Sequence, residues 1–164
     1  MIDILLTTGT CGVGKSTTTL AWANLRKGVC LEVDELRCSI RDKEFRRSNN
    51  YQEDFMLELV KSNIKLYSKL NKAIAIDYVW TPRSLDALHH YSSSFGNVKS
   101  IWLKCESKEN MNRDNLRPES RRMGARVAEL RVELENYEWP DYLNHIDTTN
   151  LSLESVINKI NELF

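Results

Sequence analysis

Apolar residues along this chain gather in short unbroken runs, and the runs are separated by longer stretches in which apolar residues recur every three or four positions. Short apolar runs predict buried strands, whereas the spacing in the longer stretches predicts helices. The predicted strands are residues 2–7, 29–33, 73–76, 98–103 and 144–146. The predicted helices are residues 16–27, 35–45, 51–70, 82–91, 108–116, 120–137 and 153–163. Two further segments interrupt the pattern. Residues 48–50 are predicted to form a loop, and residues 92–97 are predicted to form a turn.

The alternation of strands and helices predicts an α/β fold in which a parallel sheet lies between two layers of helices. A length of 164 residues suits one domain with a proper core and is too short for two ordinary domains. We therefore expect residues 1–164 to form a single domain. The sequence does not fix an oligomeric state.

Composition narrows the possible partners and the location. The 23 basic and 23 acidic residues cancel, so the chain lacks the global positive field that long nucleic-acid duplexes usually require of their partners. No stretch has the length and apolarity of a membrane span, and the N-terminus does not resemble a signal peptide. The cysteines at positions 11, 30, 38 and 105 form no C-x-x-C pair, which argues against a zinc site and for reduced thiols. We expect a soluble protein of the cytoplasm that does not engage a membrane.

Between the first predicted strand and the helix after it, the chain matches the phosphate-binding loop G-x-x-x-x-G-K-[ST] at every position. The strand, loop and helix context is the one that this motif requires. A chance glycine-rich turn before a helix is the alternative, and the complete match argues against it. The sequence thus predicts a nucleoside triphosphate site formed by Gly9, Thr10, Cys11, Gly12, Val13, Gly14, Lys15, Ser16 and Thr17.

The residue types in this loop suit phosphate chemistry. Its three glycines allow positive φ angles that turn backbone N–H groups toward phosphate oxygens. Lys15 can reach the β- and γ-phosphates of ATP, and the hydroxyl of Ser16 is a suitable Mg²⁺ ligand. Cys11 lies in surroundings that favour a reactive thiol, but a small residue that fills the loop is the simpler interpretation.

A carboxylate and an arginine follow the second predicted strand. Asp34 lies at the C-terminal end of that strand, where substrates meet an open α/β sheet, and Arg37 lies three residues later on the same helical face. Asp34 can accept the proton of an attacking hydroxyl, while Arg37 can hold this carboxylate or a phosphate. The alternative is that Asp34 caps a helix and Arg37 is solvated. We favour the catalytic interpretation, because capping gives no reason for the arginine.

The loop from Gly9 to Ser16 and the segment Val33-Asp34-x-x-Arg37 together resemble the small P-loop kinases, particularly the polynucleotide-kinase-like and nucleoside-monophosphate-kinase-like branches. The resemblance covers most of the chain, and its loop motif is much more specific than its Asp-x-x-Arg segment. It implies a three-layer α/β/α P-loop fold with a five-stranded parallel sheet in the order 2-3-1-4-5 and a small, mobile, arginine-bearing lid. It also implies transfer of the γ-phosphate of ATP to a hydroxyl or a phosphate. The guanine-reading motif N-K-x-D does not occur in the sequence, which counts against a GTPase.

Asp77 directly follows the third predicted strand, a position that suits a carboxylate which orders Mg²⁺ and its waters. Nucleoside monophosphate kinases carry Asp-Gly-x-Pro-Arg at this point. This chain resembles that motif in Asp77, Pro82 and Arg83 but has extra residues and lacks the glycine, which argues against a monophosphate acceptor. Ser16 and Asp77 are thus the predicted residues of the magnesium site. Arg83 either contacts the acceptor or is an exposed arginine.

Residues 113–126 contain five arginines and no lysine. Guanidinium groups suit the spread charge of a transferring phosphoryl group, and a hinged segment can close them over bound substrates. By the resemblance this segment is the lid, and Arg113, Arg117 and Arg121 are its preferred catalytic arginines. The alternative is a solvated basic helix whose arginines pair with Glu119, Glu129 and Glu133.

The predicted function is that of an ATP-dependent phosphotransferase. The expected acceptor is a nucleoside, a nucleotide or the 5′-hydroxyl end of a polynucleotide, which a basic patch beside Asp34 could hold. A sugar or antibiotic kinase and a kinase-type toxin would use similar parts. A protein of a different class is the other alternative, namely a nucleotide-dependent switch or binding module that hydrolyses its nucleotide slowly. The function of such a protein would depend on Lys15 and would not change in Asp34→Asn. The patch, which could equally be an ordinary exposed helix face, consists of Arg37, Arg41, Lys43, Arg46 and Arg47.

Overall fold

The computed structural model describes residues 1–47 and 49–164, and these residues form a five-stranded sheet in the order β2-β3-β1-β4-β5. All neighbouring strands are parallel, which confirms the predicted sheet and its order. Each apolar run of the sequence becomes a strand, because parallel strands that are covered on both faces need apolar side chains on both faces. The strands are β1 (Ile2–Thr8), β2 (Val29–Glu32), β3 (Ile74–Asp77), β4 (Gly96–Lys104) and β5 (Asn144–Asp147).

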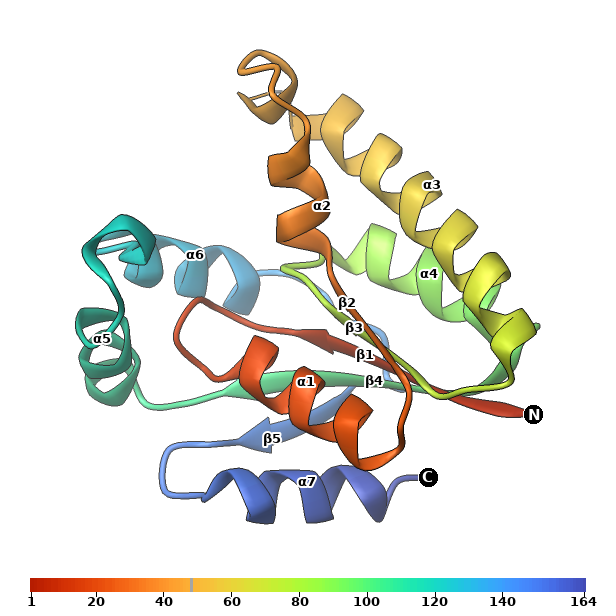
Figure 1. Cartoon of the computed structure of the whole chain (residues 1–164). Helices are drawn as coiled ribbons and strands as arrows, with labels where there is room; N and C mark the ends of the chain where they lie inside the picture. Colours follow the sequence, from red (N-terminus) through yellow and green to blue (C-terminus); the bar gives the residue numbers. More distant parts are fainter. Residues whose placement is uncertain (48) are drawn as a thin grey trace.

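Helices cover both faces of the sheet (Figure 1). One core layer joins β1 and β3 to apolar residues of α3 and α4, among them Met56, Val60 and Leu85. The second layer packs Trp22 of α1 and Ile157 of α7 against the opposite face. The helices are α1 (Lys15–Leu25), α2 (Val33–Ser39), α3 (Asn49–Tyr67), α4 (Pro82–Ser93), α5 (Ser107–Asn115), α6 (Arg126–Glu135) and α7 (Leu153–Asn161). Short 3₁₀ helices are η1 (Phe45–Arg47), η2 (Ser68–Leu70) and η3 (Glu119–Arg121).

The register of the strands brings their carboxyl ends to one edge of the sheet. Asp77 at the end of β3 lies opposite both Thr7 of β1 and Glu32 of β2. Lys104 at the end of β4 lies opposite Asp147 of β5. The phosphate-binding loop leaves β1 at this same edge, so residues that follow different strands can meet there.

The largest differences between the predicted and observed helices lie at the end of α2 and at the start of α6. The helix expected over residues 35–45 ends at Ser39, because the backbone of Ile40 is extended. The helix expected over residues 120–137 begins only at Arg126, because Gly124 has a positive φ of 55° and ends the preceding turn. Its N–H and that of Met123 bond instead to the carboxylate of Asp114.

The loop and the turn expected between elements are also shorter than predicted. In the segment 48–50, α3 already begins at Asn49; Ser48 and the side chains of Arg47 and Asn49 lie outside the described residues. In the segment 92–97, α4 runs to Ser93 and β4 begins at Gly96. Across residues 1–47 and 49–164, none of the helices is both long and apolar enough to cross a membrane.

Candidate active site

The loop between β1 and α1 takes the backbone conformation that its glycines predict. Gly9 and Gly12 have φ angles of 139° and 84°. A Cβ atom at Gly9 would lie 2.3 Å from the carbonyl oxygen of Leu103, and one at Gly12 would lie 2.6 Å from Nδ2 of Asn110. Backbone conformation and space therefore both require glycine at these two positions.

Lys15 and Ser16 begin α1 directly after the loop. The side chain of Lys15 is buried and its Nζ donates to the carbonyl oxygen of Thr10 at 2.9 Å, so the ammonium group lies over the loop. The hydroxyl of Ser16 donates to Oδ2 of Asp77 through a short hydrogen bond. Thr17 is exposed beside them. The structure thus brings together the loop and the end of β3, as the sequence predicts.

Asp77 is the point at which the charges of the site converge. Burial raises the pKa of its carboxyl, and the nearby charge of Asp34 raises it further. Lys15, the hydrogen bond from Ser16 and Arg117 act in the opposite direction and lower the pKa. Residues from the start of α1, from α2 and from the segment after α5 therefore all interact electrostatically with this one carboxyl.

The same carboxyl suits a magnesium ion. Oδ1 of Asp77 is buried, and no atom of the described residues is its hydrogen-bond partner. Buried carboxylate oxygens ordinarily have a partner, and Mg²⁺ prefers hard oxygen ligands. Asp77 and the Ser16 hydroxyl therefore fit the magnesium site expected from the sequence.

Asp34 and Arg37 form an ion pair on the first turns of α2. Nη2 of Arg37 lies 3.0 Å from Oδ1 of Asp34, and its Nε donates to the same oxygen at 3.2 Å. The N-cap of α2 is Glu32, so the alternative that Asp34 merely caps this helix is wrong. Tyr78 lies in the field of this pair: burial and then the charge of Asp34 raise its pKa to about 12.

The neighbouring ends of α3 and α4 add a second polar group. Oε1 of Glu53 accepts a short hydrogen bond from the hydroxyl of Thr81. Arg83 is exposed, and its Nη2 lies 2.7 Å from Oδ1 of Asp54. Glu53 also contributes to the raised pKa of Tyr78, after the larger effects of burial and Asp34. This end of the site therefore contains carboxylates from both α2 and α3.

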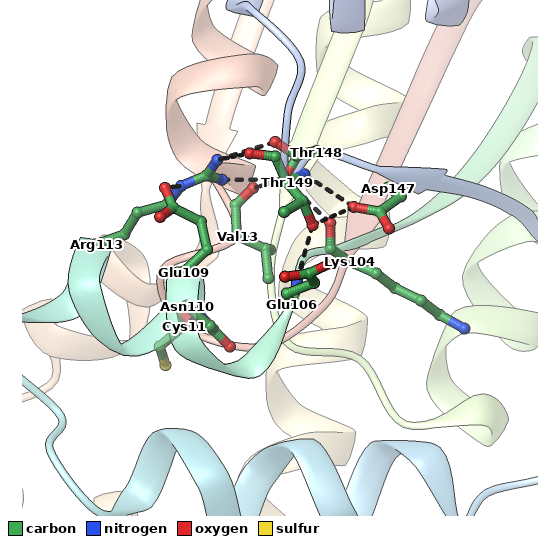
Figure 2. Close-up of polar contacts among 10 residues, drawn as sticks. All are labelled: Cys11, Val13, Lys104, Glu106, Glu109, Asn110, Arg113, Asp147, Thr148 and Thr149. Carbon is green, nitrogen blue, oxygen red and sulfur yellow. Dashed lines mark hydrogen bonds and ion pairs between the residues drawn. The ribbon is translucent and has the colours of Figure 1, made fainter.

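The three preferred arginines of the predicted lid have different surroundings. Arg113 is bound to the loop after β5, as Figure 2 shows: Nη1 donates to Oγ1 of Thr148 at 3.0 Å and Nη2 to the carbonyl oxygen of Thr148 at 2.9 Å. Arg117 lies 3.6 Å from Asp114 and acts on the pKa of Asp77. The exposed Arg121 reaches across to Glu35 of α2 at 3.7 Å.

The other two arginines of the segment make local contacts. Nε of Arg122 donates to the carbonyl oxygen of Arg117 at 2.9 Å. Arg126 pairs with Glu133 at 2.5 Å and with Glu129 at 3.4 Å. The alternative of a solvated helix held by glutamates thus describes Arg126, while Arg117 is the arginine that acts on the carboxyl of Asp77.

Three residues hold the phosphate-binding loop and the predicted lid segment, and two of them, Asn110 and Asp114, were not singled out by the sequence analysis. Asn110 is fully buried; its Oδ1 accepts from Oγ1 of Thr10 at 2.9 Å, and its Nδ2 donates to the carbonyl oxygen of Cys11. Oγ1 of Thr148 donates to the carbonyl oxygen of Val13 at 3.0 Å (Figure 2). The third is Asp114, whose carboxylate is fully buried and accepts the N–H groups of the segment before α6. The spacing of two small polar residues four positions apart, on one face of a predicted helix, was the available signal for Asn110 and Asp114.

Searches against models of protein families and against curated proteins find no match. Solved structures do match over nearly the whole chain. A sugar kinase from Janibacter sp. has a TM-score of 0.75 at 15% identity, covering 99% of this chain and 94% of the other. A gluconokinase from Sinorhizobium meliloti has a TM-score of 0.71 at 15% identity, with coverage of 99% and 90%.

A third similar structure is the Mycobacterium tuberculosis APS kinase CysC in complex with AMPPNP and APS, with a TM-score of 0.74, 16% identity and coverage of 99% and 96%. The chain therefore has the fold of the P-loop kinases of the nucleoside-monophosphate-kinase-like type. The resemblance recognised in the sequence is confirmed at the level of the fold.

Proposed function

We propose that this chain, as one kinase-like domain, transfers the γ-phosphate of ATP to a hydroxyl of a small acceptor that binds between α2, α3 and the end of β3. The observation that carries this proposal is the convergence at Asp77, where Lys15, Ser16, Asp34 and Arg117 act on one carboxyl. A phosphate-binding loop alone would serve any nucleoside triphosphatase. A carboxylate and arginine on the acceptor side support a kinase.

Each residue has a role in the proposed reaction. The cradle of residues 9–17 holds the triphosphate, and Lys15 offsets the negative charge on its β- and γ-phosphates. Magnesium, held at Ser16 and Asp77, would supply further positive charge to the phosphate oxygens. Asp34, held in place by Arg37 at 3.0 Å, orients the acceptor hydroxyl and takes its proton.

In the proposed transfer, one bond to the γ-phosphorus forms and another breaks. The acceptor oxygen forms a bond to the γ-phosphorus, the bond from that phosphorus to the bridging oxygen breaks, and ADP leaves. Arg117 and Arg121 stabilise the transferring group, as expected of lid arginines. Arg113 has a different role in this proposal, because its hydrogen bonds hold the loop after β5.

The kinases of similar fold support a small molecule as the acceptor. Two of them are described as a sugar kinase and a gluconokinase, and the third was solved with APS. A nucleoside falls within this class, and the 5′ end of a polynucleotide stays a prediction from the sequence. The four unpaired cysteines support a reducing compartment such as the cytoplasm as the place of action.

Transfer of labelled γ-phosphate to pooled acceptors tests the proposal. Wild-type protein should label a hydroxyl acceptor, and Asp34→Asn should lower the rate about 10²–10⁴-fold, the usual contribution of a general base, while ATP still binds. Lys15→Met should lose both binding and transfer, whereas the exposed control Lys65→Met should lose neither. Label that appears only as free phosphate and does not respond to Asp34→Asn would support a nucleotide-dependent switch instead.

A further inference from the structure

Two buried threonine hydroxyls face each other between α1 and the sheet. Thr7 lies near the end of β1 and Thr19 lies on α1, and both side chains are fully buried. Their Oγ1 atoms are 2.9 Å apart. Oγ1 of Thr19 donates to the carbonyl oxygen of Lys15 at 2.8 Å. Oγ1 of Thr7 lies 3.2 Å from the carbonyl oxygen of Ile76, to which it can donate. These two residues, the threonine pair, therefore join α1, β1 and β3.

The contact between the two hydroxyls goes beyond what burial requires. A buried hydroxyl needs a hydrogen-bond partner, and each member of the pair already has one in a carbonyl oxygen. The bond from Thr19 to Lys15, four residues earlier, is a common one for a threonine inside a helix. Two valines would fill almost the same space and bring no polar group that needs a partner. Packing alone therefore does not account for two facing hydroxyls at this place.

The threonine pair shares its protons between the helix and the sheet. Two hydroxyls supply two protons, whereas the pair makes three contacts. While Thr19 donates within its own helix, the proton of Thr7 goes either to Thr19 or to the carbonyl oxygen of Ile76. The first arrangement joins β1 to α1, and the second joins β1 to β3. In both arrangements each buried hydroxyl keeps a hydrogen bond.

The carbonyl partners of the threonine pair directly precede the two residues of the magnesium site. Lys15 is followed by Ser16, and Ile76 is followed by Asp77. The register of β1 and β3 also places Thr7 opposite Asp77. The hydrogen bond from Ser16 to Asp77 forms one bridge between α1 and β3, and the threonine pair forms a second bridge beside it. The oxygens of the first bridge suit a divalent cation, and partners outside the ligands commonly orient such oxygens.

From this geometry we infer that Thr7 and Thr19 are positioning residues. They set the separation between the Ser16 hydroxyl and the Asp77 carboxylate, so that both oxygens can bind one divalent cation together with ATP. This inference rests on the proposed function, since it concerns the metal site of the same reaction. Both threonines are fully buried and neither supplies a group to the nucleotide. Loss of a hydroxyl of the pair should therefore weaken metal binding and leave the binding of metal-free nucleotide unchanged.

Binding of Mn²⁺ in the presence of AMPPNP tests this inference without any phosphoryl transfer. Mn²⁺ prefers the same oxygen ligands as Mg²⁺, and electron paramagnetic resonance measures how much of it stays free. Thr19→Val should weaken Mn²⁺ binding about ten- to a hundredfold, the usual loss when an outer partner of a metal ligand is removed. Thr19→Ser keeps the hydroxyl and should bind Mn²⁺ as wild type does. Because the pair acts as one unit, Thr7→Val combined with Thr19→Val should lose little more than Thr19→Val alone.

Ser100→Ala is the matched control, since it removes another fully buried hydroxyl, which lies 2.8 Å from Nδ1 of His89. This variant should lose stability and keep the Mn²⁺ affinity of wild type. Equal Mn²⁺ affinities in wild type and Thr19→Val, or an equal loss in Ser100→Ala, would overturn the inference. A lower affinity of Thr19→Val for AMPPNP in EDTA would also overturn it, because the effect would then lie in the phosphate cradle.

The same measurements separate the inference from the proposed function. If Mn²⁺ binds as expected but labelled ATP yields only free phosphate with every acceptor, the proposed transfer is overturned and the role of the threonine pair stands. If wild type binds AMPPNP but no Mn²⁺, the metal site of the proposed function and the inference are both overturned.

Discussion

At the scale of single residues, Asp77 is a site residue whose buried carboxyl lowers the stability of the folded chain. Folding buries this carboxyl and leaves one of its oxygens without a partner among the described residues. A buried charge without full hydrogen bonding costs free energy, and a raised pKa is the usual sign of that cost. Lys15 and Ser16 offset part of it. A cation bound to the carboxylate would offset the rest of this free-energy cost.

Asp77→Asn should change how stability depends on pH. Because burial raises the folded pKa of Asp77 above its unfolded value, the folded chain keeps a proton that the unfolded chain has lost. The resulting contribution to the free energy of unfolding is present below the ordinary carboxyl pKa and is lost as the pH rises through the raised one. We therefore expect the variant to gain stability relative to wild type as the pH rises through this range. Urea unfolding at a series of pH values measures the difference.

The exposed carboxylate of Asp141 provides the control for that experiment. Asp141→Asn should show the same pH dependence as wild type. Phosphoryl transfer by Asp77→Asn should meanwhile fall about 10²–10³-fold, the loss typical of removing one charge-stabilising group. A stability difference between Asp77→Asn and wild type that stays constant over the whole pH series would contradict the account of a buried, titrating carboxyl.

At the scale of elements, α5 organises both the phosphate-binding loop and the segment predicted to be the lid. Its inner face carries Asn110 and Asp114, which are four residues apart and fully buried. The first binds the loop after β1, and the second binds the backbone that precedes α6. One short helix thus fixes the cradle for the triphosphate relative to the segment that carries the arginines.

Asn110→Ala should loosen the cradle without removing any group that touches the phosphates. The hydroxyl of Thr10 and the carbonyl oxygen of Cys11 would each lose a partner, which costs about 1–3 kcal/mol for such groups. We expect a loss of stability of that size and an ATP affinity that falls about tenfold, measured by urea unfolding and calorimetry. The exposed Asn112 of the same helix gives the control variant Asn112→Ala. Equal effects of both substitutions would show that Asn110 does not brace the loop.

Asp114→Ala should release the segment between α5 and α6. The carboxylate accepts the N–H groups of Met123 and Gly124, each at 2.9 Å. Hydrogen bonds to a charged group contribute about 1.5–3 kcal/mol, so these two amides should exchange about ten- to a hundredfold faster in the variant. Hydrogen exchange followed by NMR measures both sites. With Asn115→Ala, a change at an exposed position of α5, their rates should stay at the wild-type value.

The same elements show what the sequence could and could not predict. The phosphate-binding loop is contiguous, and Asp34 and Arg37 are three residues apart, so local patterns suffice for both. The loop's bond to Asn110 joins residues 100 positions apart, and only the packed fold brings them together. The predicted start of α6 was wrong for the same reason. The carboxylate of Asp114 holds Gly124 in a positive φ, which no helical pattern in the sequence reveals.

At the scale of the whole molecule, the phosphate-binding loop is where distant parts of the chain meet. Ser16 bonds to Asp77 of β3, 61 residues away, and Val13 bonds to Thr148, 135 residues away. Thr8 accepts the N–H of Trp80 from the segment after β3. The loop is therefore held by both halves of the sheet. A ligand that orders it should stabilise the fold as one cooperative unit.

Binding of AMPPNP with Mg²⁺ should accordingly raise the temperature of a single unfolding transition. A ligand at 100 times its Kd adds about 2.7 kcal/mol, which for a chain of this size corresponds to about 5–10 °C. Differential scanning calorimetry should show that shift in wild type and in the surface control Lys65→Met. It should be absent in Lys15→Met, since the Nζ that lies over the loop is gone. Two separate transitions, of which only one moves with the nucleotide, would contradict the coupling of the loop to both halves of the sheet.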